Sequence, residues 1–339
     1  MHKSKKKKIK IFRRILLTFI ALMLVATGAL LGYQYLSNPS VTLAYEFDRN
    51  LPMLKLSEGN NSDIADSYAD DLCVTTENIL LSGVSMEEDA SAALFDIQNQ
   101  NVLYSKDLFI KRYPASLTKV MTAYLALKYG DLTDMVTVSE TAMNIDTDSS
   151  VCYLEAGDTV SLDDLVKGLL IQSGNDAANA IAEHIGDGDP SSGNHSIESF
   201  VNLMNQEAVK MGATSTHFVN PHGLQDENHY TTAYDVYLMF NEVMKNDHFV
   251  EILNETHYTA TVKHADGTSG ELSWIATNEY HTMESTPPKD VTVIGGKTGT
   301  TKAAGNCLVL LSQDAYGNPY ISIIMNSEQK STLYEEMNQ

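Results

Sequence analysis

A serine and a lysine three residues apart stand at the start of a predicted helix. Pro114 precedes this helix, and apolar residues over 120–127 continue it as far as Gly130. Residues three apart lie on one helix face, with Cβ atoms about 5–6 Å apart, so Ser116 and Lys119 are within hydrogen-bond reach. A lysine that apolar neighbours desolvate can act as the base that a serine nucleophile needs. Many helices carry this pair by chance, so the assignment depends on the rest of the chain.

A second polar motif, Ser173-Gly174-Asn175, lies between two predicted helices. A serine in this connection could relay a proton, and the asparagine could bind a substrate amide. The same three residue types are also ordinary in a capped turn between helices. Taken alone, the motif therefore favours the turn.

A third motif, Lys297-Thr298-Gly299-Thr300, lies in a predicted strand that begins near Val291. An exposed strand edge can pair with an extended peptide through main-chain hydrogen bonds. The lysine and the threonine hydroxyls could then hold a carboxylate. A surface turn is the alternative interpretation of these residues.

The elements that must position these motifs follow from apolar periodicity, capping residues and turn residues. We expect strands at 91–97, 102–104, 136–138, 308–312 and 320–325. We expect helices at 161–172, with Ser161 as cap, and at 176–185, 196–211 and 231–246. The strands include two hairpins, and the helices occupy most of the chain between the first and third motifs.

Three histidines, His217, His222 and His229, cluster in a predicted loop. A metal site there is conceivable, but no carboxylate or thiol ligand occurs at helical spacing beside them. We therefore expect structural histidines, and we predict no metal and no cofactor for this chain.

The three cysteines, Cys73, Cys152 and Cys307, form an odd set without metal-binding spacing. Cys307 begins an apolar run, which favours a buried thiol in a strand. A disulfide between Cys73 and Cys152 is left open, because the sequence does not decide it.

The N-terminal part of the chain divides into three segments by charge and hydropathy. Residues 1–14 form a basic tail, 15–36 are almost continuously apolar, and 37–72 are polar and acidic. The apolar length and its basic flank predict a retained transmembrane anchor with the tail in the cytoplasm. A cleaved signal peptide is the alternative. Either interpretation exports the remainder, with 37–72 as a stalk and 73–339 as the folded domain.

The charge distribution bears on the possible partners. The chain has 23 lysines and arginines against 44 acidic residues, and eight of the cations precede residue 15. The exported part is therefore strongly acidic, which argues against a nucleic-acid partner. A soluble, self-repelling surface is the simplest interpretation.

Taken together, the three motifs resemble those of penicillin-binding proteins and serine β-lactamases, in the same order. With Gly174 at the centre of the second motif, the pattern is similar to the low-molecular-mass D-alanyl-D-alanine carboxypeptidases, the serine peptidase S11 family. The flanking sequences share the likeness: Tyr-Pro-Ala-Ser-Leu-Thr-Lys at 113–119, Ser-Gly-Asn-Asp-Ala-Ala at 173–178, Asn-Pro-His-Gly-Leu at 220–224 and Lys-Thr-Gly-Thr-Thr at 297–301. The resemblance covers about 74–338.

The resemblance implies an α/β (α+β) fold of the β-lactamase/transpeptidase type, with an antiparallel sheet flanked by helices and a mostly helical lobe. Ser116 would attack the D-Ala-D-Ala carbonyl of a peptidoglycan stem peptide, and Lys119 would accept its proton. Ser173 would relay the proton, and Asn175 would contact the substrate amide. β-Lactams would be covalent inhibitors.

The resemblance also assigns the third motif to substrate binding. Lys297 and Thr298 would hold the terminal carboxylate, with Gly299 and Thr300 beside them, and the N–H groups of Ser116 and Thr300 would form the oxyanion hole. No arginine follows Arg112 in the sequence. If a relative uses an arginine to bind the substrate carboxylate, Lys297, Thr298 and Thr300 of the third motif must take that role in this chain.

Two other functions remain open. A class A β-lactamase clears its acyl-enzyme with a glutamate in a Glu-x-x-Leu-Asn pattern, but Glu251-Ile-Leu-Asn254 is one residue short of it. We therefore expect slow penicillin turnover. A non-catalytic protein that binds the wall or senses β-lactams would keep the cleft without needing the nucleophile and base, both of which are present here.

Overall fold

The computed structural model describes residues 71–146, 149–189 and 192–339. The predicted tail 1–14, anchor 15–36 and all but the last two residues of the stalk 37–72 lie outside this range. Within the described part, no helix is long and apolar enough to cross a membrane. The predicted anchor therefore stays a prediction.

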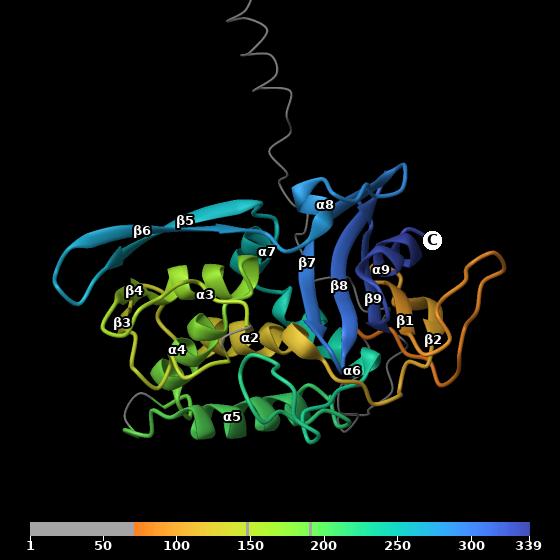
Figure 1. Ribbon diagram of the computed structural model, residues 1–339. Coiled ribbons are helices and arrows are strands. Elements are labelled where there is room, and N and C mark those ends of the chain that lie inside the picture. The colour runs from red at the N-terminus through yellow and green to blue at the C-terminus, as the bar shows by residue number, and fades with distance from the viewer. Residues whose placement is uncertain (1–70, 147–148, 190–191) are drawn as a thin grey trace, which may run out of the picture. The chain divides into compact units, whose positions relative to one another are not determined.

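A five-stranded antiparallel sheet forms one half of the folded unit, in the order β2-β1-β9-β8-β7 (Figure 1). Its strands are β1 (Ser91–Asp96), β2 (Asn101–Lys106), β7 (Val291–Thr301), β8 (Gly305–Asp314) and β9 (Pro319–Ser327). Both predicted hairpins are present, since β1 pairs with β2 and β8 with β9. Among the described strands, β7 pairs only with β8, so its other edge is open to the part of the chain that carries the first two motifs.

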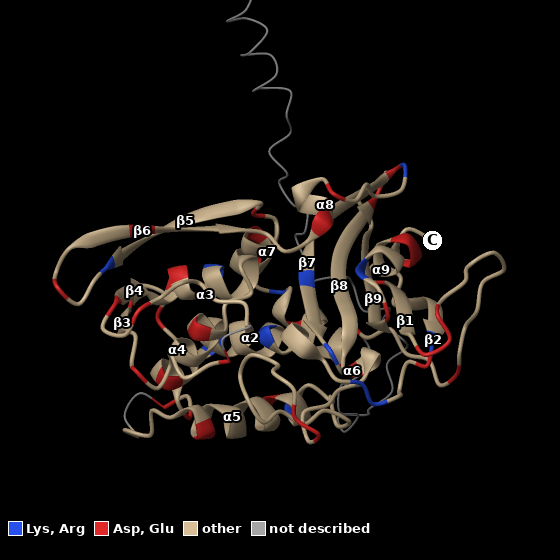
Figure 2. Cartoon of the chain, in the orientation of Figure 1, with Lys and Arg blue, Asp and Glu red and all other residues tan. Residues whose placement is uncertain are grey.

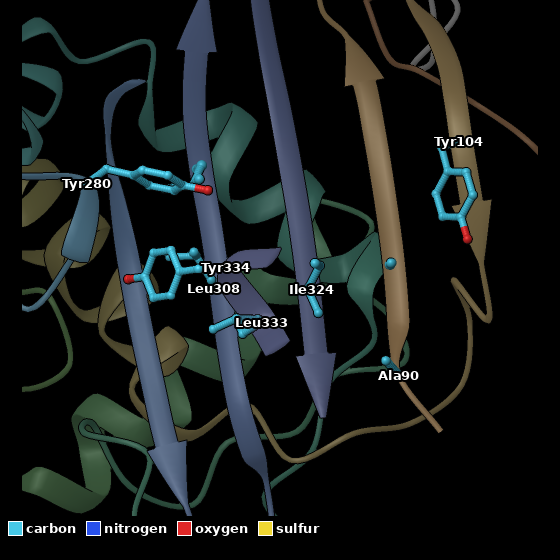
Figure 3. Packing of buried hydrophobic residues seen from close by; sticks show 9 residues of the cluster. Ala90, Tyr104, Tyr280, Leu308, Ile324, Leu333 and Tyr334 are labelled. Carbon is cyan, nitrogen blue, oxygen red and sulfur yellow. The ribbon is translucent and has the colours of Figure 1, made fainter. Parts of the chain in front are cut away.

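Both faces of this sheet are covered, because side chains that alternate along each strand pack against different helices. On one face, Leu308 of β8 and Ile324 of β9 pack in a cluster with Leu333 and Tyr334 (Figure 3). The last two residues belong to α9 (Lys330–Met337), and Tyr280 of α8 (Glu279–Thr282) joins them. On the other face, α6 (Ala233–Val243) contacts β1 and β9. This double coverage explains why the centre of β8, residues 307–311, is an unbroken apolar run.

The other half is mostly helical, as predicted. Helix α2 (Lys119–Tyr129) is its centre and packs against α3 (Leu162–Ile171), α4 (Asn175–Ile185) and α5 (Ile197–Lys210). It buries seven of its residues, Lys119 among them. Ser161 caps α3 by accepting a hydrogen bond from the N–H of Asp164, and Ser196 caps α5.

A second, four-stranded sheet extends this half, and the sequence analysis missed most of it. Its order is β3-β4-β5-β6, formed by β3 (Met135–Thr137), β4 (Thr159–Ser161), β5 (His257–Lys263) and β6 (Ser269–Ile275). The β5–β6 hairpin has one solvated face, so its apolar residues are few. Trp274 anchors it, because its indole is buried and donates to the carbonyl of Cys152 at 3.0 Å.

Two predicted details need correction, and the structure decides a disulfide that the sequence left open. The helix expected at 231–246 ends at Val243, and α7 (Asp247–Leu253) starts a new axis. The reason is Asn246, whose side chain caps α7 by accepting from the N–H groups of His248 and Phe249. The disulfide left open between Cys73 and Cys152 is not formed, since all three cysteines are free and buried. Ser116 lies on a short 3-10 turn, η1 (Ala115–Thr118), before α2 begins.

Candidate active site

The first motif is built on the turn from η1 into α2. Lys119 Nζ lies 2.9 Å from Ser116 Oγ, as the spacing predicted. Ala115 adopts a positive φ of 48°, which turns the chain sharply just before the serine. Gly223 packs against this turn, because a Cβ there would lie 1.8 Å from the carbonyl oxygen of Ala115. The absence of a side chain at Gly223 therefore lets the loop support the serine from behind.

Lys119 is completely buried and has three hydrogen-bond acceptors. Its Nζ donates to Ser116 Oγ, to Asn175 Oδ1 at 2.6 Å and to the carbonyl of His222 at 3.1 Å. Burial lowers its pKa from 10.5 to about 7, although the nearby Cys152 and Asp176 act in the opposite direction. A large fraction of Lys119 is therefore neutral near physiological pH and can accept the serine proton.

The second motif joins α3 to α4 and faces the first. Ser173 has a positive φ of 61° and is 4% exposed, and Asn175 is the first residue of α4. Gly174 between them packs on Cys152, because a Cβ there would lie 2.3 Å from its Sγ. The turn interpretation is thus correct as local structure. It also brings both polar side chains to the lysines of the other motifs.

The third motif lies on the open edge strand β7, as predicted. Lys297 is fully buried, and its Nζ donates to Ser173 Oγ and to the carbonyl of Thr298, both at 2.8 Å. A Cβ on Gly299 would lie 2.9 Å from the backbone nitrogen of Ser116, so this glycine allows β7 to approach η1 closely. The exposed Thr300 donates from its hydroxyl to Asn306 Oδ1 at 3.1 Å.

All eight predicted site residues therefore gather around the junction of η1, α4 and β7. Two buried ammonium groups link the motifs: Lys119 joins the first to the second, and Lys297 joins the third to the second. Burial lowers the pKa of Lys297 well below its usual value, and the charge of Lys119 acts in the same direction. In Figure 2, blue segments on β7 and at the start of α2 stand out from acidic surface helices.

The loop with the histidines supports the first motif. His229 Nε2 lies 2.8 Å from Thr118 Oγ1, and the carbonyl of His222 accepts a hydrogen bond from Lys119 Nζ. Burial lowers the pKa of His222 to about 3 and that of His229 to about 4, so both imidazoles are neutral. Within the described residues, no group of three or more histidine, cysteine, aspartate or glutamate side chains could hold a metal ion.

The sequence analysis missed several supporting residues. Asp176 is buried and accepts hydrogen bonds from the N–H groups of Cys152 and Leu154, which fixes the loop behind Asn175. Thr277, in the loop after β6, has its hydroxyl 2.6 Å from that of Thr298. Only the acidic residue directly after the second motif could have been noticed from sequence, as a favourable charge in the first turn of a helix.

The structure also shows where Glu251 lies, the residue that comes nearest to the glutamate pattern of class A β-lactamases. Glu251 lies exposed on α7, where its side chain contacts His248 at 3.4 Å. The described contacts give it no partner among the three motifs. This position agrees with the decision, made from spacing, that Glu251 does not activate a water for an acyl-enzyme.

Comparisons with known proteins identify the family of the chain. The family model described as D-alanyl-D-alanine carboxypeptidase matches residues 83–329. D-alanyl-D-alanine carboxypeptidase DacA of Haemophilus influenzae is 35% identical over 240 residues, which are 68% of this chain and 55% of that protein. DacF of Bacillus subtilis is 33% identical over 226 residues, 65% of this chain and 53% of that protein. The chain thus spans about half the length of these curated relatives.

Solved structures give the same answer for the fold. The Streptomyces K15 DD-transpeptidase matches with a TM-score of 0.66 and 27% identity, covering 73% of this chain and 92% of that one. The D-alanyl-D-alanine carboxypeptidase DacD from Francisella tularensis matches with a TM-score of 0.63 and 25% identity. This match covers 77% of this chain and 71% of that one. The predicted β-lactamase/transpeptidase-like fold is confirmed. With the matched family model covering most of its folded part, this chain belongs to the D-alanyl-D-alanine carboxypeptidase family of serine peptidases.

Proposed function

We propose that this chain is a serine-type D-Ala-D-Ala carboxypeptidase that removes the terminal D-Ala from peptidoglycan stem peptides. The observation that carries the proposal is the contact of Ser116 with a fully buried lysine whose pKa is about 7. A nucleophile beside a base that is partly neutral at working pH is the requirement for acyl transfer. Family membership supplies the substrate class.

Acylation begins when neutral Lys119 takes the proton of Ser116. The serine oxygen attacks the carbonyl between the two D-alanines, and the N–H groups of Ser116 and Thr300 receive the developing oxyanion. The carbon–nitrogen bond then breaks. Ser173, held by Lys297, passes its hydroxyl proton to the departing amine and takes up in return the proton that Lys119 accepted from Ser116. D-Ala therefore leaves with a neutral amine, the peptide remains as an ester on Ser116, and Lys119 is neutral again.

Substrate binding falls on the groups around the nucleophile. Asn175 contacts the amide of the stem peptide, and the open edge of β7 pairs with its extended backbone. Thr298 donates to the terminal carboxylate, and Thr300 joins it by turning its hydroxyl from Asn306 Oδ1 to the carboxylate. Lys297 is completely buried, so it acts from behind through Ser173 and the carbonyl of Thr298.

Deacylation uses water with Lys119 as the base. A β-lactam forms the same ester, but its ring-opened product stays in the site. The contacts of Glu251 place it on the exposed side of α7, so a fast β-lactamase route has no support from it. We therefore expect a long-lived penicillin adduct on Ser116. Fast nitrocefin hydrolysis would favour the β-lactamase alternative.

The deciding experiment incubates the purified full-length protein in detergent with a peptide that ends in D-Ala-D-Ala. We expect many molecules of free D-Ala to be released per molecule of enzyme. A peptide that ends in L-Ala-L-Ala should release no alanine. A Ser116→Ala variant is the control for contaminating peptidases. If the parent protein releases no D-Ala at high concentration but still forms a penicillin adduct, the sensing or binding alternative replaces the proposal.

We further propose that residues 15–36 anchor the protein in the cell membrane, with the catalytic domain outside the cytoplasm. The support is the apolar length of this segment and its basic flank. The intact protein should fractionate with membranes. Protease added to intact protoplasts, from which the wall has been removed, should degrade the catalytic domain. A soluble secreted form whose N-terminus lies near residues 28–40 would show signal cleavage instead.

A further inference from the structure

A hydroxyl contact links the third motif to a loop outside the three motifs. Thr277, between β6 and α8, has its Oγ1 2.6 Å from Oγ1 of Thr298. Both side chains are half-buried, so neither hydroxyl is sealed from solvent by the rest of the chain. The catalytic steps above give Thr277 no part.

The chemistry of this pair sets a direction for its hydrogen bond. A carboxylate only accepts hydrogen bonds, and each threonine has a single O–H to donate. Lys297 binds the carbonyl of Thr298, not its hydroxyl. If Thr298 is to donate to a substrate carboxylate, the proton between the two hydroxyls must come from Thr277. A hydroxyl that accepts one hydrogen bond also becomes a stronger donor in the next.

We propose that Thr277 is a positioning residue for recognition of the substrate's terminal carboxylate, acting through Thr298. Thr277 donates to Thr298 Oγ1 and so directs the Thr298 proton into the cleft. This inference rests on the proposed carboxypeptidase function. It adds a residue of the β6–α8 loop to the carboxylate site.

The loop that carries Thr277 is held from behind. Asn278 is 3% exposed, and its Oδ1 accepts from the N–H of Tyr280 at 3.2 Å and from the hydroxyl of Tyr334 at 3.4 Å. The Tyr334 hydroxyl in turn accepts from the N–H of Glu279 at 2.9 Å. Helix α9 therefore fixes the loop next to Thr277, which reduces the entropy lost when a carboxylate is bound.

Hydroxyl donors matter here because the nearby cations are not accessible to a carboxylate. Lys297 is 0% exposed, so a carboxylate cannot touch its ammonium in this arrangement. No arginine follows Arg112, whose Nε donates to Ser91 Oγ at 3.0 Å. The Thr300 hydroxyl donates to Asn306 Oδ1 in this arrangement, so the proposed carboxylate site relies first on Thr298 and on the residue that orients it.

The test compares Thr277→Val, which keeps the shape but removes the hydroxyl, with Thr277→Ser, which keeps the hydroxyl. Full-length protein in detergent is assayed with a D-Ala-D-Ala peptide and with the same peptide as a C-terminal amide. For Thr277→Val we expect KM for the carboxylate peptide to rise about tenfold, with kcat changed less than about twofold. The amide peptide should be affected much less, and Thr277→Ser should behave as the parent.

A second readout does not need peptide hydrolysis. The rate of acylation is measured for benzylpenicillin and for its methyl ester, which lacks the carboxylate. Thr277→Val should lower the preference for the free acid about tenfold. Equal changes for acid and ester, or failure of Thr277→Ser to restore the preference, would show a merely structural role and overturn the inference. A parent that acylates but releases no D-Ala refutes the proposed function alone, and a parent that does neither refutes both.

Discussion

The pKa of Lys119 makes a quantitative prediction about the pH dependence of acylation. Burial lowers this pKa from 10.5 to about 7, which corresponds to about 5 kcal/mol of discrimination against the ammonium form. At about pH 7, roughly half of the enzyme then has neutral Lys119, against roughly one molecule in 3,000 for an unperturbed lysine. At about pH 5 the neutral fraction is roughly 1%.

The sign follows from the role of the residue. A base must be deprotonated to act, so acylation should be slow in acid and rise through about pH 7 to a plateau. Between about pH 5 and pH 8 the rate should increase by about a hundredfold. His222 and His229 have pKa values of about 3 and about 4, so neither titrates in this window.

The assay is the second-order rate of labelling by a fluorescent penicillin, measured across pH with near-ultraviolet circular dichroism as the control for folding. A Lys119→Arg variant keeps a positive charge that cannot be released, so its labelling should fall by about a thousandfold or more. A rate independent of pH between about 5 and 8 would refute the reasoning. Near-normal labelling of Lys119→Arg would do so as well, and would move the proton route to Ser173.

Three further predictions test the supporting structure. Lys297→Ala should raise KM for a D-Ala-D-Ala peptide about tenfold while leaving measurable acylation, since Lys297 acts on the carboxylate site from behind; unchanged KM would contradict this. Gly223→Ala places a Cβ 1.8 Å from the Ala115 oxygen and should slow penicillin labelling about a hundredfold without unfolding, as melting temperature would show. Glu207 is buried with Lys128 2.5 Å away, so Glu207→Gln should cost about 2–3 kcal/mol in urea unfolding at neutral pH. Because the pKa of Glu207 is lowered from 4.5 to about 2, this contribution should disappear as pH falls from about 4.5 to 2, and a difference that persists below pH 2 would be inconsistent.

The sequence alone determined which residues make up the candidate site. The spacing of Ser116 and Lys119 places them on one helical face, and this relation is local, so it survives in the structure as a 2.9 Å contact. The open edge of β7 was also predicted, because turn residues and apolar runs identify strands and hairpins. The order of the three motifs is specific enough to indicate the family without a structure.

Local pattern was less informative where an element has one solvated face or where a side chain starts a new helix axis. The β5–β6 hairpin was missed because few of its residues are buried. The break between α6 and α7 depends on the Asn246 cap, which competes with continuation of the helix. Such choices are decided by packing and by single hydrogen bonds, which periodicity does not reveal.

Only the tertiary structure decided how the motifs act on one another. The low pKa of Lys119 requires complete burial by segments distant in the chain, among them Asn175 and His222. The burial of Lys297 likewise depends on the contact between β7 and the second motif, where its ammonium donates to Ser173 Oγ. Sequence specifies which groups are present, but desolvation and long-range contacts set their protonation and reach, because both depend on atoms brought together only by folding.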